Sequence, residues 1–290
     1  MENNTITDAL FWEAVTALDA LDAGDAEALK QLLADNPALA GKRLDQPDEG
    51  YFKQPYLLWY VADNPIRRGK LPSNIVTIAT IIIDVVRRSD PGSLQFQIDY
   101  TLGLVATGRI PKECGVQAQL INVLIDAGAR PGNGVGALAH GNPEAARLLI
   151  ERGGGMTLAA AAGLGLEEVV IRLLPQADKE EKQLALVVAA FYGRSAMLPL
   201  FMTPDVDLNA YPVKGSGFHS HATALHQAVW SGSLETVKVL VDAGADMNLP
   251  DLVYQGTPLG WALHIMEEMK SDEKAVERCA SIAEYLRKRT

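Results

Sequence analysis

The sequence contains one cluster of histidines, and imidazole serves both as a metal ligand and as an acid or base near neutral pH. His219 and His221 flank a serine, and His226 follows closely. A zinc site could take imidazoles from this cluster and a further ligand from one of the acidic residues Asp205, Asp207 and Asp251. The cluster is therefore the basis of one hypothesis, a metal-dependent enzyme.

Other constellations give weaker indications of chemistry. His264 and Glu267 lie one helical turn apart, but no nucleophile and no HExxH pattern accompanies them. The glycine-rich stretch 132–136 lacks the preceding strand and the following Lys-Ser/Thr of a phosphate loop. The Gly-Ser-Gly at 215–217 is not the Gly-x-Ser-x-Gly elbow of hydrolases. We therefore predict no catalytic residues.

Aromatic side chains gather in the same part of the sequence, and Trp and Tyr often dominate the binding energy of interfaces. The candidates are Tyr211, Phe218, Trp230, Tyr254 and Trp261. Packing inside the fold would explain any one of them equally well, but their clustering favours a binding site. We predict that a partner seats apolar groups against Trp230 and Trp261. His219, His221 and Asp251 would then set polar specificity.

The elements that position these residues are predicted to be helices. The stretch from Thr223 to Asn248 contains two apolar stripes at helical spacing. The stripes consist of Leu225, Ala228 and Val229, followed by Val237, Leu240 and Val241. Gly232 and Gly244 are the expected ends of the two helices. Neither helix is long enough to bury its stripe alone, so the unit needs copies of itself on both sides.

This unit resembles an ankyrin repeat. The matching residues are Thr223, Leu225, His226, Ala228, Gly232, Leu234, Glu235, Val237, Lys238, Leu240, Gly244, Ala245, Asp246 and Asn248. A second copy starts at Gly256-Thr257-Pro258-Leu259, and its threonine follows Thr223 by 34 residues (257 − 223), close to the period of the family. Ala224 stands where the family has proline, and Gly260 stands where it has histidine.

The resemblance implies structural roles for several of these residues. Thr223 and His226 would join hydrogen bonds that fasten the start of the inner helix to neighbouring backbone, as Thr257 and Pro258 would begin the next inner helix. Gly232 and Gly244 would supply left-handed backbone angles. Because His226 is then committed, only His219 and His221 remain for a metal, whereas a closed zinc site needs three or four ligands. We predict no metal and no cofactor.

For the whole chain, we expect one all-α ankyrin-type solenoid over residues 1–290, with about seven or eight helix-turn-helix repeats. Residues 8–40 would be the N-terminal repeat, 220–250 the best repeat, and 256–290 the C-terminal repeat and cap. The middle repeats are irregular, and the sequence leaves their boundaries between 90 and 210 open. Residues 56–61 and 76–86 would be an inner and an outer helix, and the basic connection 63–73 between them a solvated loop.

The composition of the chain argues against several classes of function. The net charge of −10 argues against sequence-independent nucleic-acid binding, which draws on Lys and Arg. The most apolar run, 75–86, contains Asp84 and is too short to span a bilayer. The N-terminus lacks the regions of a secretory signal, and the two cysteines, Cys114 and Cys279, suggest no disulfide framework. We expect a cytoplasmic monomer that binds neither nucleic acid nor membrane.

The resulting prediction is a non-catalytic module that binds another protein on the concave face of the solenoid. Two roles fit this class. An inhibitor or immunity-type protein would use its acidity to occlude a basic site, and its association rate would fall with salt. A scaffold would bind several segments weakly, with less dependence on salt. The sequence does not identify the partner.

Overall fold

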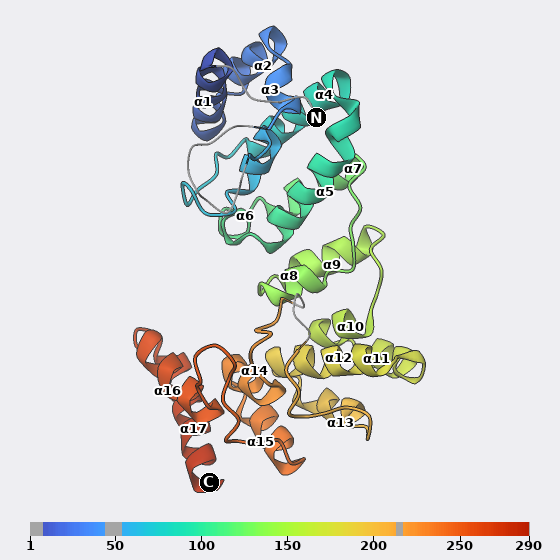
Figure 1. Cartoon of the computed structure of the whole chain (residues 1–290), viewed down its shortest axis with the longest axis vertical. Coiled ribbons are helices and arrows are strands. Elements are labelled where there is room, and N and C mark those ends of the chain that lie inside the picture. Colours follow the sequence, from blue (N-terminus) through green and yellow to red (C-terminus); the bar gives the residue numbers. More distant parts are fainter. Residues whose placement is uncertain (1–7, 44–53, 213–216, 290) are drawn as a thin grey trace. The chain divides into compact units, whose positions relative to one another are not determined.

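The computed structural model describes residues 8–43, 54–212 and 217–289, and within these ranges the regular elements are helices (Figure 1). The β-pairing recorded in these ranges is one isolated bridge, between Arg43 and Tyr56. The predicted all-α class is therefore confirmed. The number of repeats stays a prediction.

The chain forms two compact units. Unit 1 comprises Met1–Ala137 and Glu144–Gly154, and unit 2 comprises Leu138–Pro143 and Gly155–Thr290. The division passes through α8 (Val135–Ala139) and α9 (Pro143–Glu151). That all 290 residues form one continuous solenoid stays a prediction.

Unit 1 begins with a helical pair, as predicted for residues 8–40, and continues with less regular elements. Its helices before α8 are α1 (Asp8–Ala23), α2 (Ala26–Asp35), α3 (Ala38–Gly41), α4 (Ile75–Ser89), α5 (Pro91–Thr107), α6 (Arg109–Glu113) and α7 (Gln117–Asp126). The predicted inner helix at 56–61 is instead the 3-10 helix η1 (Leu57–Ala62). All six η1 side chains are buried, and the element packs on α4 and α5.

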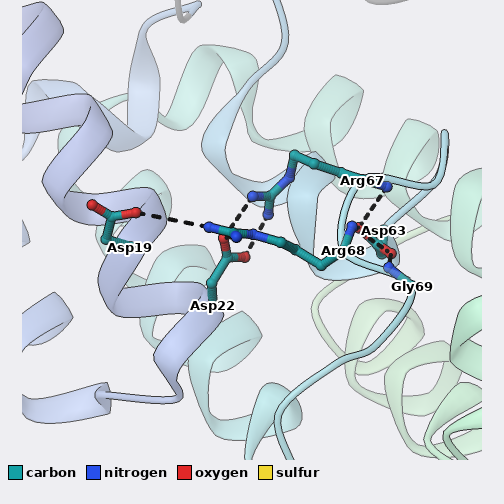
Figure 2. Close-up of polar contacts among 6 residues, drawn as sticks. All are labelled: Asp19, Asp22, Asp63, Arg67, Arg68 and Gly69. Carbon is teal, nitrogen blue, oxygen red and sulfur yellow. Dashed lines mark hydrogen bonds and ion pairs between the residues drawn. The ribbon is translucent and has the colours of Figure 1, made fainter.

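The basic connection between η1 and α4 is exposed over residues 65–70, as predicted for a solvated loop, and it is also anchored to the fold. Arg67 Nη1 donates to Asp22 Oδ2 of α1 at 2.6 Å, and Arg68 Nε donates to the same oxygen at 2.8 Å (Figure 2). The buried Asp63 carboxylate accepts the backbone N–H groups of Arg67, Arg68 and Gly69. Burial raises the pKa of Asp22, but the hydrogen bonds and charges of the two arginines outweigh it and hold that pKa below its usual value.

Unit 2 shows the solenoid pattern most clearly. Its helices are α10 (Leu158–Leu164), α11 (Glu167–Leu173), α12 (Lys179–Phe191), α13 (Leu198–Phe201), α14 (Ala224–Ser231), α15 (Leu234–Asp242), α16 (Pro258–Glu268) and α17 (Glu273–Arg289), with 3-10 turns η2 (Leu174–Gln176) and η3 (Ser195–Met197). The inner helices pack in series, α10 on α12, α12 on α14 and α14 on α16, and each contacts the outer helix that follows it (Figure 1). Each apolar stripe is buried by its neighbours.

Small side chains allow the inner helices of unit 2 to approach one another. Every residue of α10, LAAAAGL, is buried, and Ala185 to Ala190 of α12 are buried against it. A Cβ placed on Gly163 would lie 2.9 Å from side-chain atoms of both Leu138 and Val188. The alanine-rich sequence therefore reflects close helix packing in this row.

Candidate functional site

A pocket of about 560 Å³ lies in unit 2, beside the loops that precede α14 and α16. Six of its lining side chains carry rings: His219, His221, His264, Trp230, Trp261 and Tyr254. Gly256, Gly260 and Ile265 complete the lining. A concave apolar site with a few polar groups is the usual form of a binding site.

The loop between α15 and α16, residues 243–257, is called the finger here. Its tip consists of Leu252 to Tyr254, which expose their apolar side chains. The exposed fractions are 58% for Leu252, 60% for Val253 and 77% for Tyr254. Trp230, at the end of α14, is 43% exposed. Most large apolar residues of a folded chain are buried, so this group of exposed ones beside a pocket points to an interaction site.

The finger is held by the buried carboxylate of Asp251. Its Oδ1 accepts the backbone N–H groups of Val253 at 2.9 Å and Tyr254 at 2.7 Å. Its Oδ2 accepts the N–H of Gly256 at 2.9 Å and the indole Nε1–H of Trp261 at 3.0 Å. One side chain therefore fixes both the backbone of the finger and the ring that forms the pocket wall.

These hydrogen bonds also determine the charge of Asp251. Burial raises the pKa of its carboxyl, but the hydrogen bonds from Trp261 and from three backbone N–H groups outweigh burial and lower the pKa to about 2. Each oxygen accepts two hydrogen bonds, which is the full capacity of a carboxylate. Asp251 is thus a buried anion at neutral pH, and its acceptor sites are used within the fold.

His226 lies beneath the pocket and makes the hydrogen bonds that the repeat motif implied. Its Nδ1 lies 2.9 Å from Thr223 Oγ1, and its Nε2 lies 2.9 Å from the carbonyl oxygen of Gly256. Burial lowers the pKa of His226, although the Gly256 carbonyl and the charge of Asp251 act in the opposite direction. The neutral imidazole therefore joins the start of α14 to the start of the next repeat.

The rings around the pocket meet at steep angles. The ring centroids of Trp230 and Trp261 are 6.4 Å apart with an interplanar angle of 76°, and those of His221 and Tyr254 are 5.7 Å apart at 80°. His219 contacts Trp230 at 5.0 Å and 64°. Burial and the neighbouring His221 lower the pKa of His219. The rings thus surround the pocket at large angles to one another and are not stacked in parallel.

The structure brings five of the eight predicted partner-binding residues to this pocket: His219, His221, Trp230, Tyr254 and Trp261. Phe218 and Asp251 are fully buried, so in this structure they lie below the surface and cannot present a side chain to a partner. Tyr211 is half-buried, and its hydroxyl donates to the carbonyl of Pro250 at 2.7 Å, which braces the finger.

Sequence reasoning missed some residues of the site. His264 was considered only with Glu267, yet it follows Trp261 by one turn of α16 and lines the same pocket. Helical spacing from Trp261 was the signal that could have found it. Leu252 and Val253 carry no such signal, because their exposure depends on the turn around Asp251.

The acidic ligands of the metal hypothesis make other contacts. No group of three or more His, Cys, Asp or Glu residues within 8–43, 54–212 and 217–289 is placed to hold a metal ion. Asp205 pairs with Lys182 at 3.1 Å, and Asp207 accepts the backbone N–H of Asn209 at 2.8 Å. Asp251 is saturated by its internal hydrogen bonds. Glu267 likewise pairs with Lys270 and not with His264.

Comparison with known proteins gives one result for part of the chain. Residues 135–251 match the family model described as ankyrin repeats (3 copies). A search of curated proteins finds no match. The matched range includes α8 to α15 and ends at Asp251 in the finger. In the parts of the chain that the structure describes, no helix combines the length and the apolarity needed to cross a bilayer.

Proposed function

We propose that this ankyrin-repeat protein binds a segment of a partner protein in the aromatic pocket of unit 2 and on the finger tip Leu252–Tyr254. Ankyrin repeats are general modules for binding other proteins. The observation that carries the assignment to this place is the set of exposed apolar side chains, Trp230 and Leu252 to Tyr254, beside a pocket walled by rings. This surface is our candidate for the concave binding face.

Rigidity of the finger supports this proposal. Binding loses affinity when a loop must be ordered, and a preformed loop avoids that cost. Here the N–H groups of Val253 and Tyr254 are bonded to Asp251, and the N–H of Leu252 donates to the carbonyl of His221 at 2.8 Å. The apolar tip is therefore presented in one conformation before any partner arrives.

Chemistry at this pocket has less support. Among the residues that could act as bases or metal ligands, His226 and Asp251 are held in hydrogen bonds of the fold, and His219 contacts Trp230 edge to face. We therefore propose a non-catalytic role.

A peptide-display selection on the purified full-length chain would test the proposal. The selected peptides are then measured against the wild type and the double variant Trp230→Ala/Tyr254→Ala, whose side chains are exposed. Loss of two aromatic contacts should weaken binding at least about 30-fold, since a single hot-spot residue contributes about 2 kcal/mol.

The matched control is Ile171→Ala, which removes an exposed apolar side chain from α11 of the same unit. We expect this variant to bind as the wild type does. Peptides that bind the double variant and the wild type equally well would show that the binding site lies elsewhere.

Two modes of action remain distinct within the proposal. An inhibitor or immunity-type protein would bind one basic partner tightly, with an association rate that falls as salt increases, because the chain carries a net charge of −10. A scaffold would bind several segments with less dependence on salt. Association rates at low and high ionic strength for the natural partner distinguish the two. The cytoplasmic location and the monomeric state stay predictions.

A further inference from the structure

We propose that the aromatic pocket takes the guanidinium group of an arginine side chain from the partner segment. This inference rests on the proposed function, because it names the group that would enter the pocket. It is argued from the charge of the site, from the arrangement of its rings, and from the way in which the same chain holds its own arginines.

The charge of the site favours a cation. Among the described residues that line the pocket, none is Lys or Arg. The Asp251 carboxylate lies at the edge of the Trp261 ring and accepts its indole N–H at 3.0 Å. A hydrogen bond from the indole N–H to an anion increases the electron density of the ring, and a cation over the ring is attracted by that density. The pocket is thus complementary to positive charge.

Two imidazoles beside Trp261 do not oppose this charge at neutral pH. Burial and the neighbouring His221 lower the pKa of His219, so its ring is neutral at pH 7. His226, beneath Trp261 with ring centroids 5.1 Å apart, has a pKa lowered by burial and is neutral as well. Arg278 of α17 lies near Gly232, but it does not line the pocket.

Unit 1 shows how rings of this chain hold a guanidinium. The Arg43 carbon Cζ lies 5.0 Å from the ring centroid of Tyr56, 5.7 Å from that of Trp59 and 5.6 Å from that of Phe96. These three rings also meet at large angles, 71° between Tyr56 and Trp59 and 65° between Tyr56 and Phe96. The guanidinium of Arg43 thus lies among three aromatic rings. Its Nη1–H also donates to the carbonyl of Gln54 at 3.2 Å.

The pocket of unit 2 has the same kinds of walls. Its aromatic walls are two indoles and a phenol, from Trp230, Trp261 and Tyr254, where the site of Arg43 has an indole, a phenol and a phenyl ring. The rings of Trp230 and Trp261 meet at 76°. Arginine suits such a site better than lysine, because the guanidinium is planar, weakly hydrated and able to stack on rings. The positive charge of an inserted arginine would also be attracted by the net negative charge of this chain.

The test uses two short peptides of glycine and serine around one central residue, arginine in the first and citrulline in the second. Citrulline has nearly the shape of arginine but no charge. Each peptide is titrated into the ¹⁵N-labelled full-length protein at constant ionic strength, and the indole N–H signals of the four tryptophans are followed by NMR. We expect saturable shifts of the Trp230 and Trp261 signals, with the arginine peptide binding about tenfold more tightly than the citrulline peptide.

Trp59 provides an internal control, because it is buried and already lies beside Arg43; its signal should not move. The variant Trp230→Leu keeps an apolar side chain but loses a ring, and should weaken the arginine peptide several-fold. Tyr254→Leu is a second variant at an exposed position and should act in the same direction. Equal binding of the two peptides, or arginine binding unchanged in both variants, overturns the inference.

Failure of the inference can be told apart from failure of the proposed function. If peptides from the display selection depend on Trp230 but contain no arginine, the pocket binds a partner without a guanidinium, and the inference alone is wrong. If no selected peptide depends on Trp230 or Tyr254, the proposed site is wrong as well.

Discussion

At the scale of single residues, Asp251 is the group on which the site depends. A buried carboxylate is costly unless each oxygen is hydrogen-bonded, and here four N–H donors satisfy it. The donors come from the finger and from Trp261, so the same residue shapes the loop and orients the pocket wall.

Asp251→Asn should lower the free energy of unfolding by about 2–4 kcal/mol. The amide keeps the size of the side chain, but its NH₂ would face the N–H groups of Gly256 and Trp261 and leave them without an acceptor. Urea denaturation followed by circular dichroism measures the change. The control is Asp246→Asn, an exposed residue whose carboxylate accepts the N–H of Asn248, where we expect a change below about 0.5 kcal/mol. Similar effects at both positions would contradict this role for Asp251.

Stability should fall as the pH is lowered from 7.5 to 5.5. Burial is the main cause that lowers the pKa values of His219 and His226 from 6.5 in the folded state, so the unfolded chain binds protons first as the pH drops. The contribution of these neutral histidines is complete above pH 6.5 and is lost below it. Urea midpoints at the two pH values measure the loss, and His219→Gln should reduce the difference between them. An unchanged midpoint at pH 5.5 would be incompatible with buried neutral histidines.

Sequence reasoning at this scale succeeded where a motif carries the information. The hydrogen bonds of Thr223 and His226 follow from residue types at fixed spacing in the repeat. The role of Asp251 could not be predicted in the same way, because an acidic residue in a finger is usually solvated. Only the folded turn shows that three backbone N–H groups point inward at its carboxylate.

At the scale of elements, the connection between η1 and α4 shows that a basic loop can be a structural tie. Arg67 and Arg68 share one carboxylate of α1, and the side chain of Asp22 is only 15% exposed. An ion pair that is partly shielded from water contributes more to stability than one on the open surface.

Asp22→Ala should destabilise the fold by about 1–3 kcal/mol, because it removes the carboxylate that both arginines share and leaves Arg68 only the longer pair with Asp19 at 4.0 Å. The double variant with Arg67→Met should show that the two changes are not additive. The comparison is Asp84→Ala, which removes the exposed pair with Arg87 on α4 and should cost less than about 0.5 kcal/mol. Denaturation curves for the wild type, Asp22→Ala, Arg67→Met, the double variant and Asp84→Ala give these values. An additive double variant would mean that the pair makes no net contribution.

The helices themselves were predictable to different degrees. The pair α14–α15 follows from two apolar stripes ended by glycine, and Gly232 has the expected left-handed angle, with φ of 71°. The 3-10 element Leu57–Ala62 was not predictable as such, because all of its side chains are buried and no stripe marks a helical face. Capping residues were needed to place the start of α12, where Asp178 and Glu181 form a capping box.

At the scale of the whole molecule, the charge of −10 bears on how a partner is found. An acidic chain attracts a basic segment over a distance set by ionic strength, about 10 Å at 0.1 M salt. The attraction increases the rate of association more than it changes the final contacts.

The association rate of an arginine-containing ligand from the display selection should therefore fall several-fold between about 0.05 M and 0.3 M salt, with a smaller change in the dissociation rate. Stopped-flow fluorescence measures both rates. The same ligand with citrulline in place of arginine is the control and should show a weaker dependence. An association rate independent of salt would show that net charge does not guide the encounter.

The way in which the finger is held has a consequence for engineering. The backbone N–H groups of Leu252, Val253 and Tyr254 donate to His221 and to Asp251, while the side chains of these three residues are exposed. The side chains of these three residues can therefore be exchanged together without changing the backbone of the finger. A library that varies these three positions, excluding only proline because it lacks the N–H, would change what the surface recognises while preserving the scaffold that displays it.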